Sequence, residues 1–118
     1  MSLRSPKGLA KFAGTLAGTS MVEQWGSHVA KVGGKVFALI SAESGHLTFK
    51  VSEISFEGLT ELDGIDQAPY FAKRQWVSVG KDAPLGDADL KAYVRASYAT
   101  IAGKLTRKLR AELGIVTE

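Results

Sequence analysis

The sequence of 118 residues contains no cysteine. This absence excludes thiol nucleophiles, iron–sulfur clusters and cysteine-ligated zinc, and it gives no sign of an oxidising compartment. The chain also lacks any run of about 18 apolar residues, which a membrane-spanning helix needs. Residues 1–20 lack the basic, apolar and small-residue succession of a secretory signal. We therefore expect a cytoplasmic protein with no membrane contact.

The overall composition is typical of one compact domain. Apolar residues make up 45% of the chain and charged residues 23%, with a mean hydropathy of +0.01. A chain of this length buries roughly two-thirds of its unfolded surface, enough to fold without a metal or a disulfide. We expect a single domain over residues 1–118, and we base no expectation on the first three residues.

Charge is modest in total but uneven along the chain. Fifteen Lys and Arg against twelve Asp and Glu give a net charge of +3, an ordinary value for solubility. All charged residues over 53–66 are acidic, whereas all those over 91–110 are basic. A basic C-terminal helix can contact phosphates, or its cations can simply be solvated and offset the negative end of the helix.

Turn residues divide the first half of the chain into one helix and three strands. Ser5 and Pro6 favour a helix start, and Gly33-Gly34 favours a hairpin because both positions tolerate positive φ. Ser44-Gly45 marks the next turn. Short turns join antiparallel neighbours, so we predict a helix over 5–17 and a three-stranded antiparallel meander with strands over 22–32, 35–42 and 46–51.

The second half of the chain predicts two helices around a further β segment. Ser52 is a plausible cap for a helix over 52–63. Aromatic and β-branched residues over 70–79 predict one or two strands, bent at Lys73-Arg74. From Asp87 or Asp89, apolar residues recur at helical spacing as far as Leu109, which predicts a long C-terminal helix packed on the sheet. The fold class is therefore α+β.

A search for catalytic patterns finds none that is convincing. Gly33-Gly34-Lys35 lacks both the upstream glycine and the following Ser or Thr of a phosphate-binding loop. His28 and His46 are the only histidines, fewer than the three ligands of a catalytic zinc site. Ser97, inside the long helix, has no neighbouring base. We expect no enzymatic activity, no metal site and no cofactor.

Adjacent cations among aromatic residues are the strongest local pattern. Lys73 and Arg74 stand between Tyr70-Phe71 and Trp76, and such interleaving is typical of nucleic-acid-binding surfaces. The alternative is a bulge or sheet edge whose lysine prevents unwanted strand pairing. Trp25 and Trp76 each fit either a core anchor or an exposed stacking platform.

The chain resembles the MmcQ/YjbR family of small bacterial proteins. The resemblance rests on the order and spacing of several short motifs: Trp25-Gly26, Gly34-Lys35-Val36-Phe37-Ala38, Leu47-Thr48-Phe49-Lys50, Ala68-Pro69-Tyr70-Phe71 with Lys73, Trp76-Val77-Ser78-Val79, Leu90 and Ala96-Ser97-Tyr98. It implies an α+β fold of helix, three-stranded meander, helix, two strands and final helix. It also implies DNA binding of a proposed double-wing type, while the same architecture resembles secretion chaperones, which dimerise and bind protein segments.

Two functional hypotheses follow from these observations. The first is DNA binding through phosphate contacts made by a basic strand and the basic C-terminal helix; its candidate residues are Lys73, Arg74, Lys104, Arg107, Lys108, Arg110 and Trp76. If Lys73, Arg74, Arg107 and Lys108 neutralise about four phosphates, log affinity falls with log salt at a slope near −3.6. The second is a protein-interaction or chaperone-like homodimer without a role for nucleic acid, associating through the open edges of a five-stranded sheet.

Overall fold

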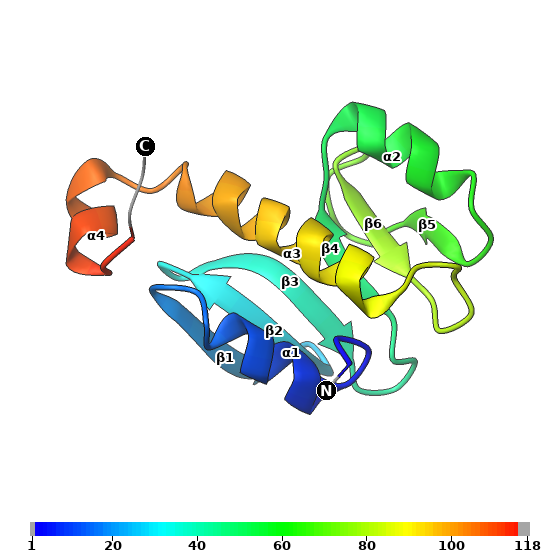
Figure 1. The fold of residues 1–118 in the computed structure, drawn as a ribbon, viewed down its shortest axis with the longest axis horizontal. Coiled ribbons are helices and arrows are strands. Elements are labelled where there is room, and N and C mark those ends of the chain that lie inside the picture. Colours follow the sequence, from blue (N-terminus) through cyan, green and yellow to red (C-terminus); the bar gives the residue numbers. More distant parts are fainter. Residues whose placement is uncertain (1, 116–118) are drawn as a thin grey trace.

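The structure, a computed structural model, describes residues 2–115 and has an α+β fold. Six antiparallel strands form one sheet in the order β1-β2-β3-β4-β6-β5. Figure 1 shows α3 lying between α1 and α2. Along the chain the elements are α1 (Pro6–Ala13), β1 (Thr19–Gln24), β2 (Ser27–Val32), β3 (Lys35–Ser41), β4 (Leu47–Lys50), α2 (Glu53–Thr60), β5 (Ile65–Gln67), β6 (Trp76–Val79), α3 (Asp87–Ala102) and α4 (Arg107–Glu112).

The two faces of the sheet differ because successive side chains of a strand point to opposite sides. Phe49 and Val77 are cross-strand partners on the face that the helices cover, and both are fully buried. Phe49 stacks on Tyr93 of α3, with ring centroids 5.7 Å apart. On the opposite face, the neighbours Thr48 and Ser78 form a row of hydroxyls that none of the described helices covers. Apolar burial against α1, α2 and α3 therefore stabilises one face and leaves the other open.

A bulge in β3 joins the sheet to α3. Ala30 of β2 pairs with Ala38, but Lys31 pairs with Val36, so Phe37 is an extra residue without a partner on β2. The fully buried Ser97 of α3 donates its hydroxyl to the Phe37 carbonyl at 2.6 Å and accepts the Lys50 N–H at 3.0 Å. The Ser97 hydroxyl thus bridges a carbonyl of β3 and an N–H of β4 that do not bond to each other directly.

The predicted order of elements is confirmed, with corrections at the turns. The strand expected over 22–32 is two strands, because Trp25 and Gly26 both have positive φ (56° and 69°) and form a tight turn. The meander therefore has four strands, and the sheet has six rather than five. Helix α1 ends at Ala13, before Gly14, and not at residue 17.

The region between α2 and α3 differs from the prediction. Strand β5 is Ile65–Gln67, whereas residues 70–75 form a loop and only Trp76–Val79 is a strand. Lys73 and Arg74 lie in the turn before β6, so the expected basic strand is wrong. Arg74 has a φ of 64°, in the left-handed region, which an extended strand does not allow.

The long C-terminal helix is also divided. Helix α3 ends at Ala102 with Gly103 as its C-cap, and the Thr106 side chain caps α4 by accepting the Leu109 N–H. Lys104 lies in the turn between them, and Arg107, Lys108 and Arg110 belong to α4. The prediction of a single helix through Leu109 is therefore wrong. The basic residues assigned to that helix divide between the turn, with Lys104, and α4.

Residues at the start of the chain contribute to the core. Leu3 is fully buried, and its N–H donates to Asp87 Oδ1 at 2.8 Å. That bond, with a further contribution from Lys91, lowers the pKa of Asp87. Arg4 donates to the carbonyl oxygens of Gly80, Ala83 and Leu85 at 2.6–3.0 Å. These contacts hold the loop between β6 and α3 against the N-terminal segment. No helix among residues 2–115 is long and apolar enough to cross a membrane.

Candidate nucleic-acid interface

Three lysines from distant parts of the chain gather where β4 ends. Lys50 closes β4, and Lys73 of the loop before β6 lines the same hollow of about 480 Å³. Lys104, in the turn after α3, lies close enough to Lys50 for the two ammonium groups to interact. The hollow also presents the neutral polar side chains of Ser52, Gln75 and Thr100. Lys73 and Lys104 were predicted site residues, and Lys50 was missed because it reads as one polar position of an alternating strand.

The charges of Lys50 and Lys104 are close and of the same sign. Burial lowers the pKa of Lys50, and the neighbouring ammonium of Lys104 lowers it further, because a second positive charge disfavours the first. Lys50 Nζ donates to Gln75 Oε1 at 2.6 Å, which is a neutral acceptor. Among the described residues, neither lysine has an ion pair with a carboxylate. An anion placed between them would relieve their repulsion.

Arg74, although beside Lys73, is occupied by carboxylates. Its Nε donates to Glu53 Oε1 at 2.9 Å and its guanidinium forms a second bond to Glu57, both on α2. These two hydrogen bonds raise the pKa of Arg74, Glu53 contributing most. Arg74 thus shares one positive charge between two carboxylates, Glu53 at the rim of the hollow and Glu57, so the three side chains together have a net charge of −1. Arg74 therefore fixes its loop to α2, and its charge is already paired with carboxylates.

The cations of α4 lie apart from Arg74 and α2. Figure 1 shows α4 at one end of the molecule and α2, to which Arg74 is bonded, toward the other. Arg107 and Lys108 are exposed, whereas Arg110 donates to the Gly103 carbonyl at 3.1 Å. Lys73, Arg74, Arg107 and Lys108 therefore do not form a single phosphate-binding face.

Trp76 is a core residue. Only 7% of its surface is exposed, and its ring lies 4.5 Å from that of Phe71 between centroids. Lys50 Nζ lies 5.9 Å from the Trp76 ring centroid. The alternative of a stacking platform at Trp76 is wrong, because Phe71 and the surrounding core leave no open ring face for a base. Its position instead links the lysine cluster to the Phe71 loop.

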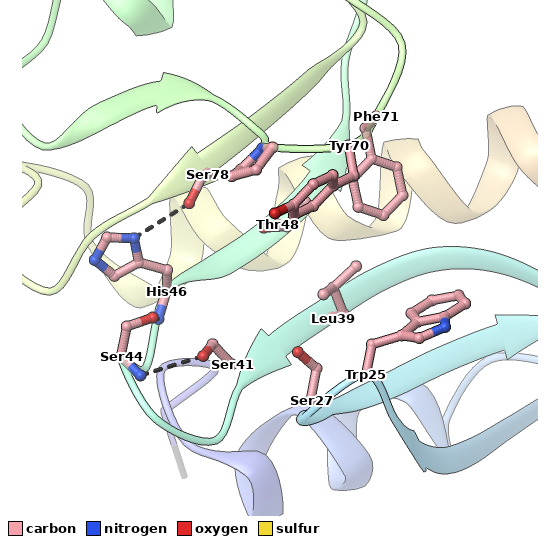
Figure 2. Close-up of a pocket in the computed structure, with 11 residues that line it drawn as sticks. Trp25, Ser27, Leu39, Ser41, Ser44, His46, Thr48, Tyr70, Phe71 and Ser78 are labelled. Carbon is pink, nitrogen blue, oxygen red and sulfur yellow. Dashed lines mark hydrogen bonds between the residues drawn. The ribbon is translucent and has the colours of Figure 1, made fainter.

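A second and larger hollow lies on the uncovered face of the sheet. This groove has a volume of about 660 Å³. Residues of β2, β3, β4 and β6 form its floor, and the loop at residues 69–71 forms one side. In Figure 2 the rings of Trp25, Tyr70 and Phe71 gather toward one end, with Leu39 between Trp25 and the other two. The other end is polar: Ser41, Ser44 and His46 lie there, and His46 Nδ1 is 3.2 Å from Ser78 Oγ. No pattern in the sequence predicts this groove.

The loop that carries Tyr70 is held by one amide side chain. Gln67 Nε2 donates to the carbonyl oxygens of Ala68 and Phe71 at 2.9 and 3.3 Å, and Gln67 Oε1 accepts the Arg74 N–H at 2.9 Å. Gln67 thereby fixes both ends of the 68–74 loop, and with them the positions of the aromatic rings beside the groove.

Comparison with known proteins relates the chain to one family and to two solved structures. The model of the YjbR family matches residues 14–100, in agreement with the resemblance seen in the sequence. Protein DR2400 of Deinococcus radiodurans, with the DUF419 domain, has a similar fold: the TM-score is 0.81 at 24% identity, covering 97% of this chain and 94% of that one. A protein from Pseudomonas syringae has a TM-score of 0.58 at 23% identity, covering 70% of this chain and 86% of its own. At these identities the structures establish the fold alone. No curated protein gives a significant match.

Proposed function

The chain belongs to the YjbR family, and we propose that it binds DNA by placing backbone phosphates at Lys50, Lys73 and Lys104. The observation that carries this proposal is that Lys50 and Lys73 line one hollow, where the charge of Lys104 also acts on Lys50. Neither Lys50 nor Lys104 has an ion pair with a carboxylate among the described residues. Two uncompensated cations at short range disfavour each other and favour an anion between them. DNA offers phosphates at regular intervals and therefore matches a surface with several fixed cations.

The three lysines account for binding to the phosphate backbone of DNA and not for recognition of its base sequence. Lysine is a point charge with three donors, so it binds a phosphate without distinguishing the base attached to it. Among the described residues, none of the helices contains Asn or Gln, which are common readers of bases in the major groove. We therefore expect salt-sensitive binding that depends little on sequence.

Fluorescence anisotropy of a labelled duplex tests the proposal. If Lys50, Lys73 and Lys104 neutralise about three phosphates, log affinity falls with log salt at a slope near −2.7. The double variant Lys50→Gln/Lys104→Gln is expected to weaken binding and to reduce that slope by about 1.8, since about two phosphate contacts are lost.

The matched control removes the same charge from α4. Arg107→Gln/Lys108→Gln lowers the net charge by the same amount, but the two residues lie in an exposed part of α4. We expect this variant to keep most of the affinity and the slope. A larger loss in the α4 variant would move the interface to α4, and an absence of binding at low salt would contradict DNA binding itself.

A second candidate function, homodimer formation, has one observation in its favour. Within residues 2–115, β1 pairs with β2 alone, so one side of this six-residue strand is an open edge, and Val22 on it is exposed. An open edge can pair with a second copy. Light scattering should then give twice the 12.6 kDa of one chain, and Val22→Lys should restore the monomer. A monomer at high protein concentration would exclude this association.

A further inference from the structure

The groove on the uncovered face of the sheet has features of a ligand site. Trp25 is 68% exposed and Tyr70 is fully exposed, and both rings border the groove. Both residues also have positive φ, 56° for Trp25 and 69° for Tyr70. Large side chains rarely adopt this conformation, and such strain is concentrated at binding sites. The Trp25-Gly26 turn and the 68–74 loop thus hold two rings at the mouth of the groove. The hydrophobic effect alone would favour burying both rings and does not explain their exposure.

The floor of the groove offers hydrogen bonds without charge. Ser27 and Thr48 are nearly buried there, and their hydroxyls form no side-chain hydrogen bond to another described residue. Among the described residues that line the groove, none is Lys, Arg, Asp or Glu. A hydroxyl donates and accepts, so it suits a neutral ligand with polar edges. The combination of ring faces and hydroxyls fits a flat heteroaromatic ring, and it does not fit a phosphate.

The groove and the lysine cluster are connected through aromatic side chains. Phe71 lines the groove and packs on Trp76, with centroids 4.5 Å apart. Lys50 Nζ lies 5.9 Å from the other ring of that pair, the Trp76 indole. A phosphate held at Lys50 therefore lies next to the aromatic end of the groove. A nucleotide contains both parts, a charged backbone and a neutral flat base.

We propose that the groove accepts an unpaired nucleobase, which stacks on Trp25 or Tyr70 and bonds to the hydroxyls of Ser27 and Thr48, so that single-stranded DNA is the preferred ligand. This inference rests on the proposed function, because the lysine cluster holds the backbone beside the groove. Base stacking on aromatic side chains tolerates all four bases. The hydroxyls are equally tolerant, since each can act as donor or acceptor.

The experiment compares two labelled strands of equal length and charge by anisotropy. One strand is an oligothymidylate of twelve nucleotides. The other has the same sugar-phosphate backbone but carries no bases. The protein is expected to bind the oligothymidylate at least about fivefold more tightly, which is a typical effect of one stacked base. At least one of the variants Trp25→Asn and Tyr70→Asn, the one that removes the stacked ring, should lose most of this preference, and both should leave binding of the abasic strand unchanged. Asparagine accepts positive φ, so both variants keep their backbone conformation.

Tryptophan fluorescence gives a second readout from the same samples. Trp25 is exposed and Trp76 is buried, so a base stacked at the groove should quench the emission of Trp25. The quenching should be absent in Trp25→Asn and absent with the abasic strand. Equal affinity for the two strands overturns the base site and leaves phosphate binding intact. A preference for oligothymidylate that persists in both Asn variants overturns the assignment to this groove. No binding of either strand overturns the base site, and the titration of the duplex then decides separately whether the lysines bind DNA phosphates.

Discussion

Replacement of Ser97 by alanine is expected to destabilise the protein by about 2–4 kcal/mol, because two buried backbone groups lose their partner. The Phe37 carbonyl and the Lys50 N–H both bond to the Ser97 hydroxyl. Ser97 is completely buried, with a relative exposed surface of 0%. Water cannot replace the hydroxyl without opening the contact between α3 and the sheet. Thermal unfolding followed by circular dichroism should show the melting temperature falling by roughly 10 °C.

The matched control for Ser97 is Thr100→Ala on the same helix. Thr100 is exposed, and its hydroxyl bonds only to the Ala96 carbonyl one turn back. Loss of that bond should change the free energy of unfolding by less than about 0.5 kcal/mol. If Ser97→Ala were no more destabilising than Thr100→Ala, the hydroxyl would not be needed to join β3 and β4.

Replacement of Arg4 by methionine is expected to cost about 2–3 kcal/mol, since hydrogen bonds from a charged donor are stronger than neutral ones. The Arg4 guanidinium donates to three carbonyl oxygens of the loop between β6 and α3. Methionine keeps most of the aliphatic bulk and removes the donors. Urea denaturation gives the loss of stability, and trypsin gives its location, because Lys81 in the released loop should be cleaved faster.

Lys7→Met on α1 is the control for Arg4. Lys7 is exposed and forms no ion pair or side-chain hydrogen bond among the described residues. This variant makes the same change in charge and should alter neither the urea midpoint nor the rate of cleavage after Lys81. A similar loss in both variants would attribute the effect to net charge, and the three carbonyl contacts would then contribute nothing measurable.

Local patterns predicted the elements whose turns have ordinary turn residues. Gly33 and Gly34 have φ of 57° and 81°, as the hairpin requires, and the predicted chain reversal between β2 and β3 is confirmed. The Trp25-Gly26 turn was missed because tryptophan is not a turn residue, and the apolar pattern runs through it. The end of α3 was missed because Leu105 and Leu109 continue the apolar stripe, although Gly103 and Thr106 mark a C-cap and an N-cap.

The candidate site depends on contacts that local patterns do not contain. Lys50 and Lys104 are 54 positions apart and meet only because α3 crosses β4. Arg74 looked free in the sequence, but the fold brings α2 and its two carboxylates to it. For Trp25 the sequence allowed either a core anchor or an exposed platform, and the fold places its ring, like that of Tyr70, at the surface. Charge and composition indicated that cations and aromatic rings form the candidate sites. The tertiary structure determines which of these side chains are exposed and unpaired.

The hydrogen bonds of Ser97 also have a consequence for how the molecule opens. Because this hydroxyl bridges β3 and β4, amide protons in α3 and in the strand ends beside it should exchange with solvent only when the whole domain unfolds. Helix α4 has no fully buried residue, so its amides should exchange through a local opening of lower free energy. Lys104 is bonded to the last turn of α3 through its N–H to Ile101 and belongs to the slowly exchanging unit. Fraying of α4 would then leave the lysine cluster assembled, with Arg107 and Lys108 on a short tether beside it.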